Sequence, residues 1–176
     1  GMLASNSILF SLIGASILFW LGHESPAIIL TLLGASLSGL LVYNWPPAKV
    51  FMGDSGAAFI GYVVAVIALY TVAEEMLNFW TWIILMGYFV ADTTTTMFIK
   101  IATVPGWFYE EHRNHAYQQL ASVWKSHRRV TLMVLATTTF WMAPMALLSL
   151  RFQQNATILA VIALAPIIIL TLCRGP

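Results

Sequence analysis

PAIILTLLGASLSGLLVY, residues 26–43, is a run of eighteen residues without a charge. A membrane-spanning helix needs about 20 mostly apolar residues. Other segments of this length and character occupy residues 6–22, 56–73, 78–100, 129–149 and 156–173. Within hydrocarbon only helices and closed barrels satisfy every backbone polar group, and the alternating pattern of a barrel is absent. We therefore predict an all-α polytopic membrane helix bundle, with about six transmembrane helices in a single domain over residues 1–176.

The composition supports the bilayer as the solvent of this chain. Hydrophobic residues make up 60% of it and charged residues only 9%, whereas soluble domains carry about 25% charged residues. The single cysteine, Cys173, excludes an internal disulfide and a multi-cysteine metal cage. The net charge of +1 carries no message about partners, and we predict no binding of nucleic acid.

Basic residues gather in one set of loops. This set contains Lys49, Lys100, Arg113, Lys125, Arg128, Arg129 and Arg174, and the opposite set contains only Arg151. Because cytoplasmic loops of membrane proteins are enriched in Lys and Arg, loops 44–55 and 100–128 and both termini are predicted to face the cytoplasm.

NWPPAKVFMGDSG, residues 44–56, interrupts the apolar pattern with backbone and charge chemistry. The proline pair should end the preceding helix, and the glycines permit positive φ and close approach of a ligand. We expect Ser55 to cap the next helix, whose N-terminus carries partial positive charge. Together with Lys49 and Asp54, the loop could hold a phosphate and a divalent metal ion. The alternative is that Asp54 or Ser55 only caps a helix.

Asp92 lies within the fourth apolar run, where a carboxylate costs about 2.5–3.5 kcal/mol to insert. Asp92, Thr96 and Lys100 follow i, i+4, i+8 spacing and should share one helix face. Asp92 then lies roughly 12 Å from Lys100, within reach of a polar cleft open to the cytoplasm. The alternative is a purely structural carboxylate, bonded to a neighbouring threonine or another helix.

The 100–128 loop carries a second polar cluster. His112 and His115 lie three residues apart, but zinc needs three or four protein ligands and no third is evident. Arg113, His115 and Gln118 instead form a set suited to recognising anions and amides. The basic run from Lys125 to Arg129 is interpreted as a contact with lipid headgroups.

Taken in order, PAKVFMGDSG, an acid late in the next span, and HRNHAYQ resemble the polyprenyl-phosphate N-acetylhexosamine-1-phosphate transferases of glycosyltransferase family 4. The resemblance covers residues 26 to 128. It implies transfer of a sugar-1-phosphate from a UDP-N-acetylhexosamine to undecaprenyl phosphate, with release of UMP, at the cytoplasmic face of the bacterial inner membrane. It also implies Mg²⁺ or Mn²⁺ as cofactor. The H-A-Y-Q form resembles the subgroup that initiates O-antigen and related surface polysaccharides.

The resemblance, with the residue chemistry above, defines the predicted site. Asp54 would hold the metal, and Asp54, Asp92 and His115 are the candidate catalytic residues. The candidate substrate-binding residues are Asn44, Lys49, Ser55, Lys100, His112, Arg113, Tyr117 and Gln118. The family's H-x-H-H motif maps onto residues 115–118, where only the first histidine is retained. Homodimerisation is left open.

The family has a longer chain, with paired aspartates and an N-x-x-D-G motif before this region. Neither is present here, and Gly1-Met2-Leu3-Ala4 resembles the residues that follow that D-G. The chain is therefore expected to be a carboxy-terminal half, inactive alone if the missing residues are essential. The competing hypothesis is a non-catalytic membrane protein, such as a transporter bundle or an assembly scaffold. It leaves the two polar loops on one side unexplained, and Mg²⁺-dependent binding of a UDP-sugar would separate the two.

Overall fold

The computed structural model describes residues 1–103 and 115–174, and within these ranges every regular element is a helix. The first three long helices are α1 (Met2–Trp20), α2 (Glu24–Asn44) and α3 (Gly53–Ala73). They are followed by α4 (Phe79–Leu85), α5 (Gly87–Thr103), α6 (Ala116–Trp124) and α7 (His127–Thr137). A π-helical segment, Thr138–Met142, connects α7 to α8 (Ala143–Arg151), and a 3₁₀ turn, Gln153–Asn155, leads into α9 (Ala156–Arg174).

Five helical stretches of the described residues are long and apolar enough to cross a membrane, and the α4–α5 pair makes six if it counts as one span. The five are Met2–Trp20, Glu24–Asn44, Gly53–Ala73, His127–Arg151 and Gln153–Cys173. The predicted all-α membrane bundle is thus confirmed. Large apolar side chains remain exposed on several helices, as Phe59, Phe140 and Val161 illustrate. In a bilayer these side chains would face lipid.

The fourth span differs from the prediction. Instead of one straight helix over residues 78–100, α4 and α5 meet at a bend of 81°. Gly87 lies at this bend, where an added Cβ would stand 2.8 Å from Leu164 Cδ2 and 3.2 Å from Met142 Sδ. A side chain at this position would displace the ends of the Leu164 and Met142 side chains, so glycine suits the close start of α5.

The broken span is held by contacts at its lower end and along its length. Helix α4 packs against α8 and α9, and α5 packs against α9. The side chain of Asn78 caps α4 by accepting a hydrogen bond from the Thr81 N–H at 2.8 Å, and its amide donates to the Ser149 carbonyl at 3.0 Å. The bend therefore belongs to a packed arrangement of α4, α5, α8 and α9.

Proline affects the last two spans differently. Pro144 stands in the first turn of α8, just after the π-helical segment. The missing N–H and the ring of a proline disturb the preceding helical turn, and a π turn is one way to absorb the disturbance. Pro166 lies inside α9, which continues on both sides of it.

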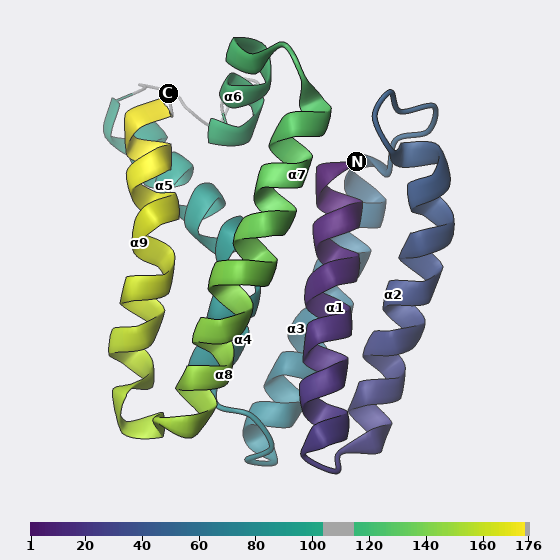
Figure 1. The fold of residues 1–176 in the computed structure, drawn as a ribbon, viewed down its shortest axis with the longest axis vertical. Helices are drawn as coiled ribbons and strands as arrows, with labels where there is room; N and C mark the ends of the chain where they lie inside the picture. Colours follow the sequence, from purple (N-terminus) through teal and green to yellow (C-terminus); the bar gives the residue numbers. More distant parts are fainter. Residues whose placement is uncertain (104–114, 175–176) are drawn as a thin grey trace.

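The two polar segments lie at the same end of the bundle. The α2–α3 connection, α6 and both chain ends are at the top of Figure 1, whereas the α1–α2, α3–α4 and α8–α9 turns are at the bottom. Helix α2 ends at Asn44, just before the proline pair, as predicted. The segments that the distribution of basic residues assigns to one side thus lie at one end of the bundle (Figure 1), and their cytoplasmic orientation stays a prediction.

Candidate functional site

A cavity of about 590 Å³ opens at the end of the bundle where the polar segments meet. Its lining comes from the start of α1, the α2–α3 connection, α5, α6 and α7. Residues from these elements include Leu3, Pro47, Phe51, Asp92 and His115. A volume of this size lies within the range of small-molecule sites, which are mostly apolar with a few placed polar groups.

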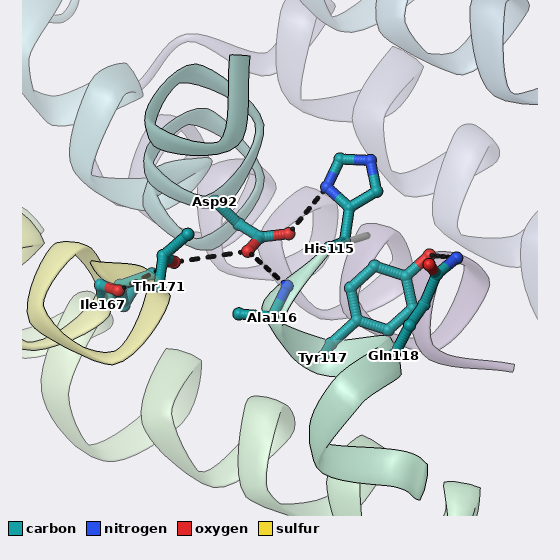
Figure 2. A network of polar contacts seen from close by, with 7 residues as sticks. All are labelled: Asp92, His115, Ala116, Tyr117, Gln118, Ile167 and Thr171. Carbon is teal, nitrogen blue, oxygen red and sulfur yellow. Dashed lines mark hydrogen bonds and ion pairs between the residues drawn. The ribbon is translucent and has the colours of Figure 1, made fainter. Parts of the chain in front are cut away.

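Asp92 brings a buried carboxylate to this cavity. Its side chain is only 5% exposed. One carboxylate oxygen, Oδ2, lies 3.1 Å from Nδ1 of His115. The other oxygen, Oδ1, accepts a hydrogen bond from the Ala116 N–H at 3.3 Å and lies 3.3 Å from the Thr171 hydroxyl. Figure 2 shows these partners around the carboxylate. Asp92 therefore has features of both hypotheses derived from sequence. It lines a cavity, as a functional carboxylate would, and it is hydrogen-bonded to other helices, as a structural one would be.

His115 stands directly before α6, and its side chain is 25% exposed. Its ring stacks on that of Tyr117, with centroids 5.7 Å apart and planes 20° from parallel. The Tyr117 hydroxyl accepts a hydrogen bond from the Gln118 amide at 3.3 Å. Burial raises the pKa of Tyr117 above its ordinary value. His115 and Tyr117 line the cavity, whereas Gln118 contributes to the site through Tyr117.

The α2–α3 connection borders the cavity with Pro46, Pro47, Ala48 and Phe51. Asn44 is buried, and its amide donates to the Val50 carbonyl at 2.7 Å, so its side chain closes the loop on itself. Lys49, Asp54 and Ser55 are exposed, and none of the three is among the lining residues. These three residues lie close in sequence to Ala48 and Phe51, which line the cavity, but their own side chains are exposed.

The prediction that Ser55 caps the third helix is wrong. The helix begins at Gly53, so Ser55 lies within its first turn, and the residue before the helix, Met52, makes no side-chain capping bond. The glycine prediction holds at Gly53, whose φ of 69° lies in the left-handed region. This conformation lets the chain turn into α3 three residues earlier than the expected start at residue 56, because a residue without Cβ adopts it at little cost.

Asp92, Thr96 and Lys100 share a buried face of α5, as the spacing predicts, and are 4%, 4% and 7% exposed. The Thr96 hydroxyl has no hydrogen-bond partner within the described ranges. The candidate residues His112 and Arg113 lie outside the part of the chain that the structure describes.

The fit of a divalent metal rests on the carboxylates at this end of the bundle. No group of three or more His, Cys, Asp or Glu side chains able to hold a metal occurs within residues 1–103 and 115–174. Both oxygens of Asp92 already contact protein groups. Asp54 offers an exposed carboxylate in the first turn of α3. One carboxylate is a fitting protein contribution for Mg²⁺, which commonly keeps waters and shares substrate phosphates.

Two contacts of the site were not anticipated from sequence. Thr171 reaches Asp92 from α9, 79 positions along the chain, and the backbone N–H of Ala116 meets the same carboxylate. Thr171 is one hydroxyl in an apolar run, and any residue has an N–H, so neither offers a sequence signal. Only the packing of α5, α6 and α9 reveals them.

These features define the class of protein, which is a multi-pass membrane protein with a ligand-sized cavity at one end. Residues 1–72 match the family model described as Glycosyl transferase family 4. No solved structure matches the chain.

Curated relatives agree with this match. The chain is 40% identical over 105 residues to a phospho-N-acetylmuramoyl-pentapeptide-transferase of Shouchella clausii, an overlap of 58% of this chain and 30% of the relative. It is 31% identical over 102 residues to a probable undecaprenyl-phosphate N-acetylglucosaminyl 1-phosphate transferase of Bacillus subtilis, covering 57% of the chain and 28% of the relative. A phospho-N-acetylmuramoyl-pentapeptide-transferase of Oceanobacillus iheyensis is 34% identical over 133 residues, 72% of this chain and 36% of that protein.

The chain therefore spans about a third of the length of the relatives it matches. The relatives are named as phospho-sugar transferases. These names agree with the general class of transferase that the sequence resembles. None of these three relatives is named as an O-antigen enzyme, so the subgroup assignment stays a prediction.

Proposed function

We propose that this chain contributes the sugar-nucleotide end of a membrane transferase. The reaction moves an N-acetylated hexosamine-1-phosphate from its UDP-sugar to undecaprenyl phosphate and releases UMP. The observation that carries the proposal is the cavity of about 590 Å³, which brings the α2–α3 connection and His115 to one place. This is the place where the family resemblance puts the donor.

The chemistry of the reaction explains the charged and polar side chains at this end of the bundle. Transfer between two phosphorylated substrates brings several negative charges together, and catalysis depends on positioning and on neutralising that charge. Lys49 supplies a cation on the exposed loop, and Lys100 supplies another at the end of α5. His115 offers a ring nitrogen to a ligand in the cavity. The phosphate of the acceptor lipid is itself the nucleophile, so the protein need not provide one.

A divalent ion completes the proposal. Mg²⁺ or Mn²⁺, when bound, would neutralise charge on the donor diphosphate. Asp54 is the carboxylate we assign to it, with the remaining ligands from substrate and water. Ser55, in the same exposed turn, is assigned to the phosphates of the donor.

The finer assignments follow from the resemblance and the charge distribution. We place the active end at the cytoplasmic face of the bacterial inner membrane. The product would initiate O-antigen or another surface polysaccharide. The names of the relatives make peptidoglycan the main alternative destination.

Substitution of Asp54 by Asn tests the proposal. The complete gene product, in membranes, is supplied with a UDP-N-acetylhexosamine, undecaprenyl phosphate and Mg²⁺, and UMP release is measured. Loss of a metal-binding carboxylate should lower the rate by roughly 100-fold or more, of the order found when one charge-stabilising group is removed. Chelation of the divalent ion should abolish release in the wild type.

The matched control is Glu74→Gln, the same change of carboxylate to amide at an exposed position at the opposite end of the bundle. It should leave UMP release unchanged. A near wild-type rate for Asp54→Asn would refute the metal assignment. Absence of Mg²⁺-dependent UDP-sugar binding in the wild type would instead favour a transporter or a scaffold.

A further inference from the structure

The two carboxylate oxygens of Asp92 contact different partners. Oδ2 contacts His115, and Oδ1 contacts Ala116 and Thr171. We propose that Asp92 is a positioning residue that fixes the tautomer of His115, so that Nε2 is the nitrogen presented to the cavity. The proposal gives the carboxylate a role other than contact with metal or sugar. The geometry stands by itself, and its consequence for catalysis rests on the proposed function.

The first step is the contact between the two side chains. Asp92 Oδ2 and His115 Nδ1 are 3.1 Å apart. An ionised carboxylate only accepts hydrogen bonds, so Nδ1 must carry the proton in this contact. In a neutral ring the other nitrogen, Nε2, is then an unprotonated acceptor, and in Figure 2 it points away from Asp92. The tautomer of a histidine is set in this way by the hydrogen bond of its other nitrogen.

The second step is that the carboxylate is itself held in one orientation. Its Oδ1 faces the Ala116 N–H at 3.3 Å, and this N–H belongs to the first turn of α6. An acceptor at the N-terminus of a helix satisfies a free donor and is favoured by the helix dipole. The Thr171 hydroxyl lies 3.3 Å from the same oxygen and 3.0 Å from the Ile167 carbonyl. Contacts from α6 and α9 thus fix the orientation of the Asp92 carboxylate independently of its contact with His115.

These two steps predict the behaviour of Asp92→Asn. The Ala116 N–H needs an acceptor, so the amide oxygen of the new side chain should take the place of Oδ1. The amide NH₂ then faces Nδ1 of His115 and donates to it. This change retains the start of α6 but reverses the tautomer, so that the proton moves to Nε2. If Asp92 acted only through its Oδ1 contacts with Ala116 and Thr171, the tautomer of His115 would not change.

Nitrogen-15 NMR of histidine-labelled protein measures the tautomer directly. The sample is the complete gene product in detergent micelles, at a pH where histidine is neutral, and a His115→Gln variant assigns the signal. We expect Nδ1–H in the wild type and Nε2–H in Asp92→Asn. Thr171→Val retains the carboxylate and should keep Nδ1–H. A wild-type ring protonated on Nε2, or an unchanged tautomer in Asp92→Asn, would overturn the proposal.

Activity provides the second arm. If the pair acts as one unit, Asp92→Asn and His115→Gln should lower UMP release by similar factors, roughly tenfold or more, and the double variant no further. Additive losses would contradict a shared function. An unchanged His23 signal serves as the control for folding, because His23 lies directly before α2, at the end of the bundle opposite to the cavity (Figure 1). If the wild type releases no UMP, the proposed function fails, and the NMR arm still decides the tautomer.

Discussion

Asn78 offers a direct test of the broken span that carries Asp92 to the cavity. Its side chain makes three contacts at the lower end of α4. The Oδ1 atom accepts from the Thr81 N–H at 2.8 Å and from the Thr81 hydroxyl at 3.0 Å, and the amide donates to the Ser149 carbonyl at 3.0 Å. Substitution by Ala removes all three.

The magnitude follows from these contacts. Loss of an N-cap side chain costs about 1 kcal/mol, and an interhelical hydrogen bond in a membrane protein contributes about 0.6 kcal/mol. The Thr81 hydroxyl retains a partner, because Ser149 Oγ lies 2.8 Å away. No large penalty for an unsatisfied hydroxyl should be added. We therefore expect Asn78→Ala to lower the free energy of unfolding by about 1.6 kcal/mol.

Unfolding in mixed micelles with increasing sodium dodecyl sulfate, followed by circular dichroism, measures this loss. Asn78→Asp keeps the capping oxygen but sets a carboxylate oxygen against the Ser149 carbonyl in place of the amide donor, so it should lose at least about 0.6 kcal/mol. Gln154→Ala, at an exposed position of the α8–α9 turn, should change stability by less than about 0.5 kcal/mol. If Asn78→Ala is no less stable than Gln154→Ala, the capping role assigned to Asn78 is wrong.

Two further predictions concern other buried groups. Trp82 is 1% exposed and donates from Nε1 to the Thr71 hydroxyl at 2.8 Å. Trp82→Phe should therefore destabilise the chain by on the order of 2 kcal/mol through the lost bond and the void, as measured by the same unfolding assay. Trp80→Phe, at a half-buried position, should cost distinctly less, and equal losses would show that burial of Trp82 is not the cause. Burial raises the pKa of Tyr117 from its ordinary value of 10.0, so above pH 10 the unfolded chain releases this proton before the folded chain does. Stability should fall as pH rises through that range, and Tyr117→Phe should reduce the slope. An identical slope in the variant would exclude Tyr117 as the source.

The spans could be predicted from sequence because a bilayer imposes a simple length and apolarity requirement. The helix bounds of α2 and α3 follow the 26–43 and 56–73 runs to within a few residues. The break before Gly87 could not be predicted, because a glycine in a membrane helix is common and its neighbours Met142 and Leu164 come from distant parts of the chain. Local sequence therefore predicted the candidate crossings, of which the described residues hold five, or six if the α4–α5 pair is one span, but it missed the bend in that pair.

The site shows the same division. Asp92 was recognisable because a carboxylate within an apolar run demands an explanation, and its shared face with Thr96 and Lys100 followed from helical spacing. Its contacts with His115 and Thr171 join helices that sequence spacing cannot bring together. The assignments of Asp54 to a metal and of Lys49 to phosphate stay predictions, since both side chains are exposed and outside the cavity lining.

The contrast between the two carboxylates at this end suggests how they divide the work. A carboxylate already surrounded by an imidazole, a backbone N–H and a hydroxyl would have to give up these partners to coordinate a metal, as Asp92 would. An exposed carboxylate at a helix start has only water to release, and Asp54 is in that position. Desolvation thus favours Asp54 for the ion and Asp92 for orientation. Two results together would establish this division of roles. Asp92→Asn would reverse the His115 tautomer and leave the metal requirement for UMP release unchanged. Asp54→Asn would change the metal requirement and leave the tautomer unchanged.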